Sequence, residues 1–259
     1  MTARAPRGDD CSRVHCLVLT AILAAAPVAS AAAALPARVE RIVLHVLGNP
    51  SYGKDEHRFV FYDPPRTLAL WRRPSFGAHW IVWTDGSLWP RHVPAGTPRY
   101  WTPDASRPAD ARERALLADE ARPVYSHLFR GNSSSVGIEI AHSGRSDAPF
   151  PDAQARTAAW LVATLLEMSG GRLRESDVFG HKDLDQRPAY VRGRCERPGC
   201  LVFVDDAGRP FRRRVDPPEA LFASLARHGL AVPRPEGADL ELARAERMAA
   251  GALRLSVAR

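Results

Sequence analysis

The sequence predicts an α/β fold in which a mixed central β-sheet is flanked by helices. Short apolar runs rich in branched residues alternate along the chain with segments whose apolar residues recur at helical spacing. The chain has 259 residues, 45% of them hydrophobic and 25% charged. This length suits one well-buried domain better than two large ones, and the composition fits neither a disordered chain nor a membrane bundle.

Several short segments have the composition of strands. Residues 41–47 and 135–141 are apolar runs that suit buried central strands. The pair Asp85-Gly86 predicts a tight turn, so the strand before it should form a hairpin with residues 87–93. Besides the second strand of this hairpin, the segments expected to form strands are 41–47, 57–63, 78–84, 135–141 and 178–181.

The clearest predicted helix begins at Pro151-Asp152 and ends at Gly170-Gly171. Apolar residues recur within it at i, i+3 and i+4, namely Ala158, Leu161, Val162, Leu165 and Met168. A second helix is expected over 217–230 with proline in its first turn, and a short one around 111–121. Residues 231–259 are rich in alanine, glutamate and arginine, which predicts a peripheral helical extension.

Residues 1–31 have the three-part layout of a secretory signal peptide. Three arginines precede an apolar run at 15–29, and Ala29-Ser30-Ala31 has the small-residue pattern of a cleavage site. A membrane anchor is the alternative, but the apolar run is shorter than the ~20 residues that a spanning helix needs. We therefore expect an exported protein, periplasmic or extracellular, with no stable membrane insertion after cleavage.

The charge and the cysteines indicate the setting of the mature chain. The formal net charge is +7, which favours anionic partners. The arginines are scattered and no nucleic-acid-binding motif is present, so nucleic acid is not expected as a partner. Cys195 and Cys200 remain after the leader is removed. A disulfide is expected between them in an oxidising compartment, and a metal knuckle is the alternative, although no second cysteine pair completes it.

Three polar residues interrupt or end the apolar strands. His45 lies inside IVLHV, Glu139 lies inside VGIEI, and His181 ends VFGH. A single buried histidine is usually a hydrogen-bonded core residue, but burying a carboxylate costs several kcal/mol unless it is paired or used. Imidazole and carboxylate ligands with one open position make a catalytic zinc site, which is the chemistry that the three residues together predict.

These residues belong to a series of motifs that resembles a known family. The series is IVLHV, GAHWIVWTDGSLW, GNSSSVGIEIAH, FPDAQ before a long helix, FGHKDL and RRRVDPP. In this order it resembles the zinc-dependent N-acetylmuramoyl-L-alanine amidases, a family that includes the phage-lysozyme-type amidases and the animal peptidoglycan recognition proteins. The resemblance covers about 40–230, so the amidase domain is expected over 32–230.

The resemblance implies a role for five positions. His45, His181 and Asp216 match the zinc ligands, and Glu139 matches the catalytic glutamate. Arg214 matches a lysine or histidine that stabilises the oxyanion, and as an arginine it would act by charge and not as a proton shuttle. The implied reaction is zinc-dependent hydrolysis of the amide bond between N-acetylmuramic acid and L-alanine in peptidoglycan or muropeptides.

Two features leave alternatives open. An insertion at about 184–212 separates His181 from Asp216 by more than the family pattern implies. It carries the cysteine pair, so Cys195 is the rival third ligand. The family also includes members that bind muropeptides without cutting them and enzymes restricted to anhydro-muropeptides, and both remain alternative functions.

Overall fold

The structure is a computed structural model that describes eleven stretches of the chain. These are residues 33–47, 64–70, 78–92, 99–122, 134–142, 144, 148–184, 189–190, 203–204, 210–212 and 216–234. They all belong to the compact unit Ala31–Arg259. The expected leader, the expected strand at 57–63, Arg214 and both cysteines of the expected disulfide lie outside the described residues.

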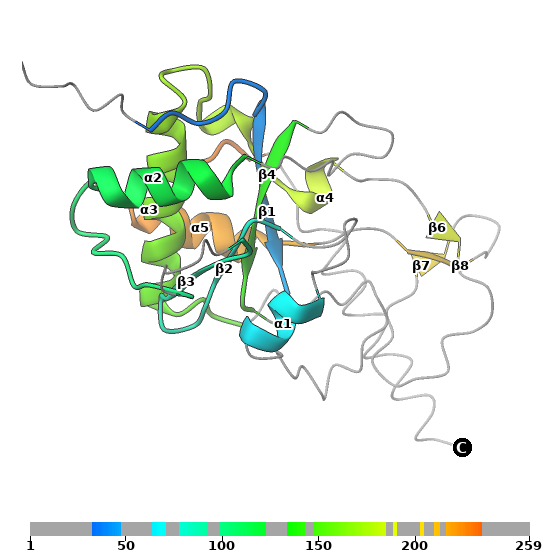
Figure 1. The fold of residues 1–259 in the computed structure, drawn as a ribbon. Helices are drawn as coiled ribbons and strands as arrows, with labels where there is room; N and C mark the ends of the chain where they lie inside the picture. Colours follow the sequence, from blue (N-terminus) through cyan, green and yellow to red (C-terminus); the bar gives the residue numbers. More distant parts are fainter. Residues whose placement is uncertain are drawn as a thin grey trace, which may run out of the picture. The chain divides into compact units, whose positions relative to one another are not determined.

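The centre of the fold is a five-stranded mixed sheet in the order β3-β2-β4-β1-β5 (Figure 1). Strands β1, β2, β4 and β5 run parallel, whereas β3 pairs antiparallel with β2. Their bounds are Arg41–Val46 for β1, Trp80–Val82 for β2, Leu88–Pro90 for β3, Ser135–Ile140 for β4 and Val178–Gly180 for β5. The predicted α/β class with a mixed sheet is therefore confirmed.

Helices connect and cover these strands. Their bounds are Pro64–Leu70 for α1, Ala111–Glu120 for α2, Asp152–Met168 for α3, His181–Leu184 for α4 and Glu219–Arg227 for α5. The three helices predicted at 111–121, 151–170 and 217–230 are confirmed as α2, α3 and α5, while α1 and α4 were not predicted. Residues 231–234 are not helical, and the rest of the expected C-terminal extension lies outside the described residues.

The insertion contains a small antiparallel sheet in the order β6-β8-β7. Its strands are β6 (Ala189–Tyr190), β7 (Phe203–Val204) and β8 (Pro210–Arg212). Strand β8 is the middle strand and pairs antiparallel with both β6 and β7.

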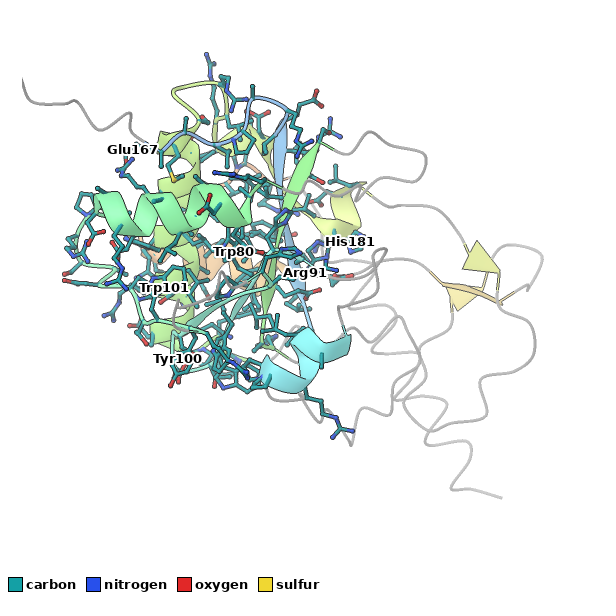
Figure 2. The ribbon with its side chains drawn as sticks, in the orientation of Figure 1. Trp80, Arg91, Tyr100, Trp101, Glu167 and His181 are labelled. Carbon is teal, nitrogen blue, oxygen red and sulfur yellow. The ribbon has the colours of Figure 1, made fainter. Side chains whose placement is uncertain are left out.

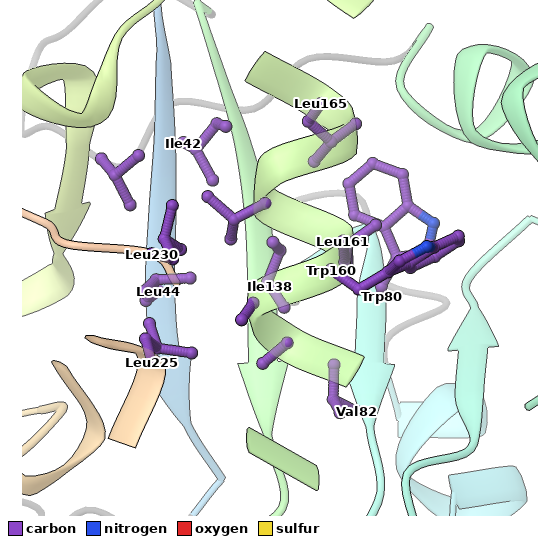
Figure 3. Close-up of a cluster of buried hydrophobic side chains, with 14 of the residues drawn as sticks. Ile42, Leu44, Trp80, Val82, Ile138, Trp160, Leu161, Leu165, Leu225 and Leu230 are labelled. Atoms are coloured by element: carbon purple, nitrogen blue, oxygen red, sulfur yellow. The ribbon is translucent and has the colours of Figure 1, made fainter. Parts of the chain in front are cut away.

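One face of the main sheet carries the principal core (Figure 3). Alternate residues of the central strands, such as Ile42, Leu44 and Ile138, are fully buried against α3, where Leu161 and Leu165 are also fully buried. This alternation follows from the period of two in a strand, which sends successive side chains to opposite faces. Helices α2, α3 and α5 form the layer on this face (Figure 1).

The other face of the main sheet carries a smaller apolar cluster and the polar residues His45 and Glu139. Ala78 and Ile81 are buried there, and Leu68 of α1 packs against them. Because His45 and Glu139 are out of phase with the core-facing residues of β1 and β4, they belong to this second face. None of the helices that the described stretches contain is long and apolar enough to span a membrane.

The turn between β2 and β3 depends on Gly86. Its φ is +84°, and a Cβ placed there would lie 2.9 Å from the backbone oxygen of Ala153 in α3. Thr157 donates a hydrogen bond to the Gly86 carbonyl at 2.8 Å, so the turn and α3 are in direct contact. The turn therefore needs a residue that has no side chain and tolerates positive φ.

Replacing Gly86 by alanine should lower the free energy of unfolding by more than about 2 kcal/mol, since a left-handed conformation costs about 1–2 kcal/mol and the clash adds to it. Urea unfolding measures this loss. Gly170→Ala is the matched control, because Gly170 also has positive φ but a Cβ added there would meet no atom within 4 Å. Equal losses in the two variants would contradict the contribution of the contact with α3.

Candidate metal centre

His45 and Glu139 are placed side by side by the register of two neighbouring strands. His45 of β1 pairs with Glu139 of β4 in the parallel ladder. Paired residues of adjacent strands point to the same face, and neighbouring strands lie about 4.8 Å apart. Each is the second-last residue of its strand, so both lie at the carboxyl end of the sheet. His45 is buried and Glu139 is half-buried, so both have little contact with solvent.

His181 reaches the same place from the next strand. Strand β5 pairs with β1 and ends at Gly180, the register partner of Leu44, so the residue after Gly180 arrives beside His45. The sequence predicts that His181 ends the strand, but it is the first residue of α4. The His181 side chain is buried and lies beside the central strands (Figure 2).

Asp216 approaches from the segment before α5. Its backbone carbonyl accepts a hydrogen bond from the Lys182 N–H at 2.8 Å, which joins it to α4. A Cβ at Gly180 would lie 2.9 Å from Cδ of Pro217, so only glycine allows this approach. The Asp216 side chain is 2% exposed. Burial of this kind requires that the carboxylate be paired with a positive charge or a metal.

His45, His181 and Asp216 form a compact group that could hold a metal ion. One possible ligand atom from each residue lies within 4.8 Å of the other two. Oδ2 of Asp216 is 3.8 Å from Nδ1 of His45 and 3.6 Å from Nδ1 of His181. The two imidazole rings lie 4.4 Å apart at an angle of 68°.

The spacing and the chemistry of this group fit a zinc ion. Nitrogen and oxygen ligands of tetrahedral zinc lie about 2.1 Å from the metal, which places two ligand atoms roughly 3.4 Å apart. The two distances to Asp216 are close to this value and are longer than a hydrogen bond. Two imidazoles and one carboxylate leave the fourth position open, as in catalytic zinc sites.

The structure also accounts for two other buried histidines. His79 is fully buried, and its Nδ1 accepts a hydrogen bond from the Gly137 N–H at 2.9 Å, which ties β4 to the residue before β2. His142 accepts from the Gly144 N–H and stacks on Phe150. Burial lowers the pKa of His142. These contacts give both histidines structural roles.

A group of four charged residues surrounds two of the candidate ligands along the chain. Lys182, Asp183, Glu219 and Arg234 are linked by ion pairs. Burial alone would raise the pKa of Glu219, but hydrogen bonds from Arg234 and Lys182 outweigh it and lower the pKa. For Arg234, burial works to lower the pKa, and hydrogen bonds to Glu219 and Asp183 raise it. Glu219 and Arg234 are therefore both charged at neutral pH.

The fold and the centre define the class of this protein: an α/β protein with a candidate metal site of two histidines and one aspartate beside a glutamate. A family model described as N-acetylmuramoyl-L-alanine amidase matches residues 35–199, and the chain belongs to this family. The match includes His45, Glu139 and His181 and ends before Asp216. Comparisons with curated proteins and with solved structures found no match.

Proposed function

We propose that the protein is an exported zinc amidase that hydrolyses the amide bond between N-acetylmuramic acid and L-alanine in peptidoglycan or muropeptides. The observation that carries the proposal is the convergence of His45, His181 and Asp216 in one buried group, with Glu139 on the neighbouring strand. Membership of the amidase family supports the substrate class. A wall substrate agrees with the expected export signal at 1–31.

The three ligands would hold zinc, which supplies Lewis-acid polarisation of the scissile carbonyl and acidifies the attacking water. As metal ligands, the imidazoles of His45 and His181 would be neutral, so that with the carboxylate of Asp216 the three groups would contribute a single negative charge. The site with a divalent ion would then retain net positive charge, which suits the oxyanion that develops during attack.

We assign the movement of the proton to Glu139. Its carboxylate accepts a proton as the water oxygen forms a bond to the carbonyl carbon. The carbon–nitrogen bond then breaks, and Glu139 returns the proton to the leaving nitrogen. The products are the lactyl carboxylic acid of the sugar and a peptide with a free L-alanine amine. We propose that Arg214 stabilises the oxyanion by its charge, in keeping with its family position.

Removal of the metal tests this proposal directly. The purified protein lacking residues 1–31 should release peptides from peptidoglycan, lose this activity with a chelator and recover it when zinc is restored. Released amino termini and mass spectrometry of the products measure the cleavage.

Other outcomes would identify a different function. Tight muropeptide binding that a chelator does not affect, with no peptide release, would show a binding module of the same fold. Cleavage of soluble anhydro-muropeptides with intact peptidoglycan left uncut would restrict the activity to that substrate.

A further inference from the structure

Two of the proposed ligands come from segments that are far apart in the chain. His181 begins α4, whereas Asp216 precedes α5, and the insertion lies between them. The hydrogen bond from Lys182 N–H to the Asp216 carbonyl joins the two segments through their backbones. Contacts that orient metal ligands affect metal affinity, so contacts that hold α4 against α5 should influence how tightly the metal binds.

Arg234 makes such a contact from beyond α5. Its guanidinium pairs with both carboxylate oxygens of Asp183, Nη1 with Oδ2 at 2.6 Å and Nη2 with Oδ1 at 2.8 Å. The same guanidinium pairs with both oxygens of Glu219, through Nε at 2.9 Å and Nη2 at 2.8 Å. One side chain therefore binds one carboxylate of α4 and one carboxylate of α5 in a two-point manner.

The surroundings favour a strong and well-ordered contact. The side chains of Arg234 and Asp183 are only 14% and 15% exposed. The guanidinium lies 3.7 Å above the ring of Phe222, and Lys182 pairs with Glu219 at 2.8 Å. Two cations and two anions thus neutralise one another where solvent screening is weak. The planar fork of arginine fixes both carboxylates in direction as well as in distance.

Each carboxylate that Arg234 binds lies next to a proposed ligand. Asp183 is two residues after His181, and its Oδ2 also accepts a hydrogen bond of 2.6 Å from the N–H of Gly180, the residue before His181. Glu219 is the first residue of α5 and follows Asp216 by three positions. A shift of either helix would move the imidazole of His181 relative to the carboxylate of Asp216.

We propose that Arg234 is a positioning residue that fixes the spacing of His181 and Asp216 and thereby tightens zinc binding. The inference rests on the proposed zinc site. Arg234 lies beyond the segment that matches the family model, which ends at residue 199. Removing the guanidinium deprives Asp183 and Glu219 of their shared cation, and like charges then favour separation of α4 and α5.

The test is the zinc affinity of Arg234→Met, measured by competition with a chromogenic chelator on the purified protein. Methionine retains much of the length and packing over Phe222 but cannot bind either carboxylate. The zinc dissociation constant should rise about 10-fold to 100-fold, the usual range for groups that orient metal ligands. Arg234→Lys keeps the charge without the fork and should give an intermediate affinity.

Arg172→Met separates positioning from general stability. Arg172 donates hydrogen bonds to the carbonyls of Leu35 and Val39, before β1 and away from the carboxyl end that carries His45. This variant should lower the melting temperature and leave the zinc dissociation constant unchanged. The inference is overturned if Arg234→Met also binds zinc as tightly as the unaltered protein.

Glu219→Gln provides a second route if Arg234→Met does not fold. Glutamine retains the shape of the Glu219 side chain but not its charge, so its contact with Arg234 and zinc binding should both weaken. An unchanged zinc affinity would reject the proposal. The zinc dissociation constant is measured without any assay of peptide release. A protein that binds zinc but does not cut peptidoglycan would refute the proposed function and leave the role of Arg234 to be judged by affinity alone.

Discussion

Asp216→Ala should abolish stoichiometric zinc binding and reduce kcat/KM by at least about a thousand-fold. Asp216 is the one acidic member of the group that could hold the metal, and its Oδ2 lies 3.6 and 3.8 Å from the two imidazoles. Loss of the metal removes several kcal/mol of transition-state stabilisation, and each 1.36 kcal/mol corresponds to tenfold in rate. Metal analysis of the purified variant and kinetics of peptide release measure the two effects.

Cys195→Ala is the control for this experiment, because Cys195 is the rival third ligand that the sequence leaves open. The variant should keep about one zinc ion per chain and retain most of the activity. If Asp216→Ala kept its zinc and Cys195→Ala lost it, the third ligand would be the cysteine. Loss of zinc in both variants would instead show that the insertion contributes to the integrity of the site.

Glu139→Gln should retain zinc while kcat/KM falls about 10²-fold to 10⁴-fold, the usual contribution of a general acid–base residue. Glutamine has the shape of glutamate but cannot accept the proton of the attacking water. Glu139 pairs in register with His45 on one side and with Ile81 on the other, so the strand pairing should hold. Peptide release at saturating zinc, together with metal analysis, measures the result.

Glu167→Gln is the matched control for the glutamate substitution. Glu167 is labelled in Figure 2 and lies in α3, and its side chain is 61% exposed and pairs with Arg114. The same chemical change at this position should leave zinc content and kinetics unaltered. A Glu139→Gln variant with activity within about tenfold of the unaltered protein would assign the proton transfer to another group.

The strands and helices that carry the site were largely predictable because each has a strong local pattern. The apolar run around His45 predicted β1, and the run around Glu139 predicted β4, both of which the structure contains. The start signal Pro151-Asp152 and the stop signal Gly170-Gly171 likewise lie close to the observed ends of α3 at Asp152 and Met168. Helix α1 was missed, because a short element with two prolines and no clear apolar period gives a weak signal.

The family resemblance drawn from the ordered motifs is confirmed by the match over residues 35–199. Asp216 was selected by the proline and the helix that follow it, as in the family pattern, and it lies outside this match. The role of Arg234 had no local signal at all. A lone arginine after a helix is indistinguishable in sequence from a solvated surface residue.

The amino-acid sequence by itself determined the α/β class, the amidase family and the polar residues that interrupt apolar strands. These properties reside in local periodicity and in motifs of a few consecutive residues, which one segment expresses without its neighbours. Tertiary structure alone decided that His45, His181 and Asp216 lie within reach of one ion and that Arg234 joins α4 to α5. Such contacts depend on strand register and helix packing between distant segments, and no local pattern encodes the distance between them.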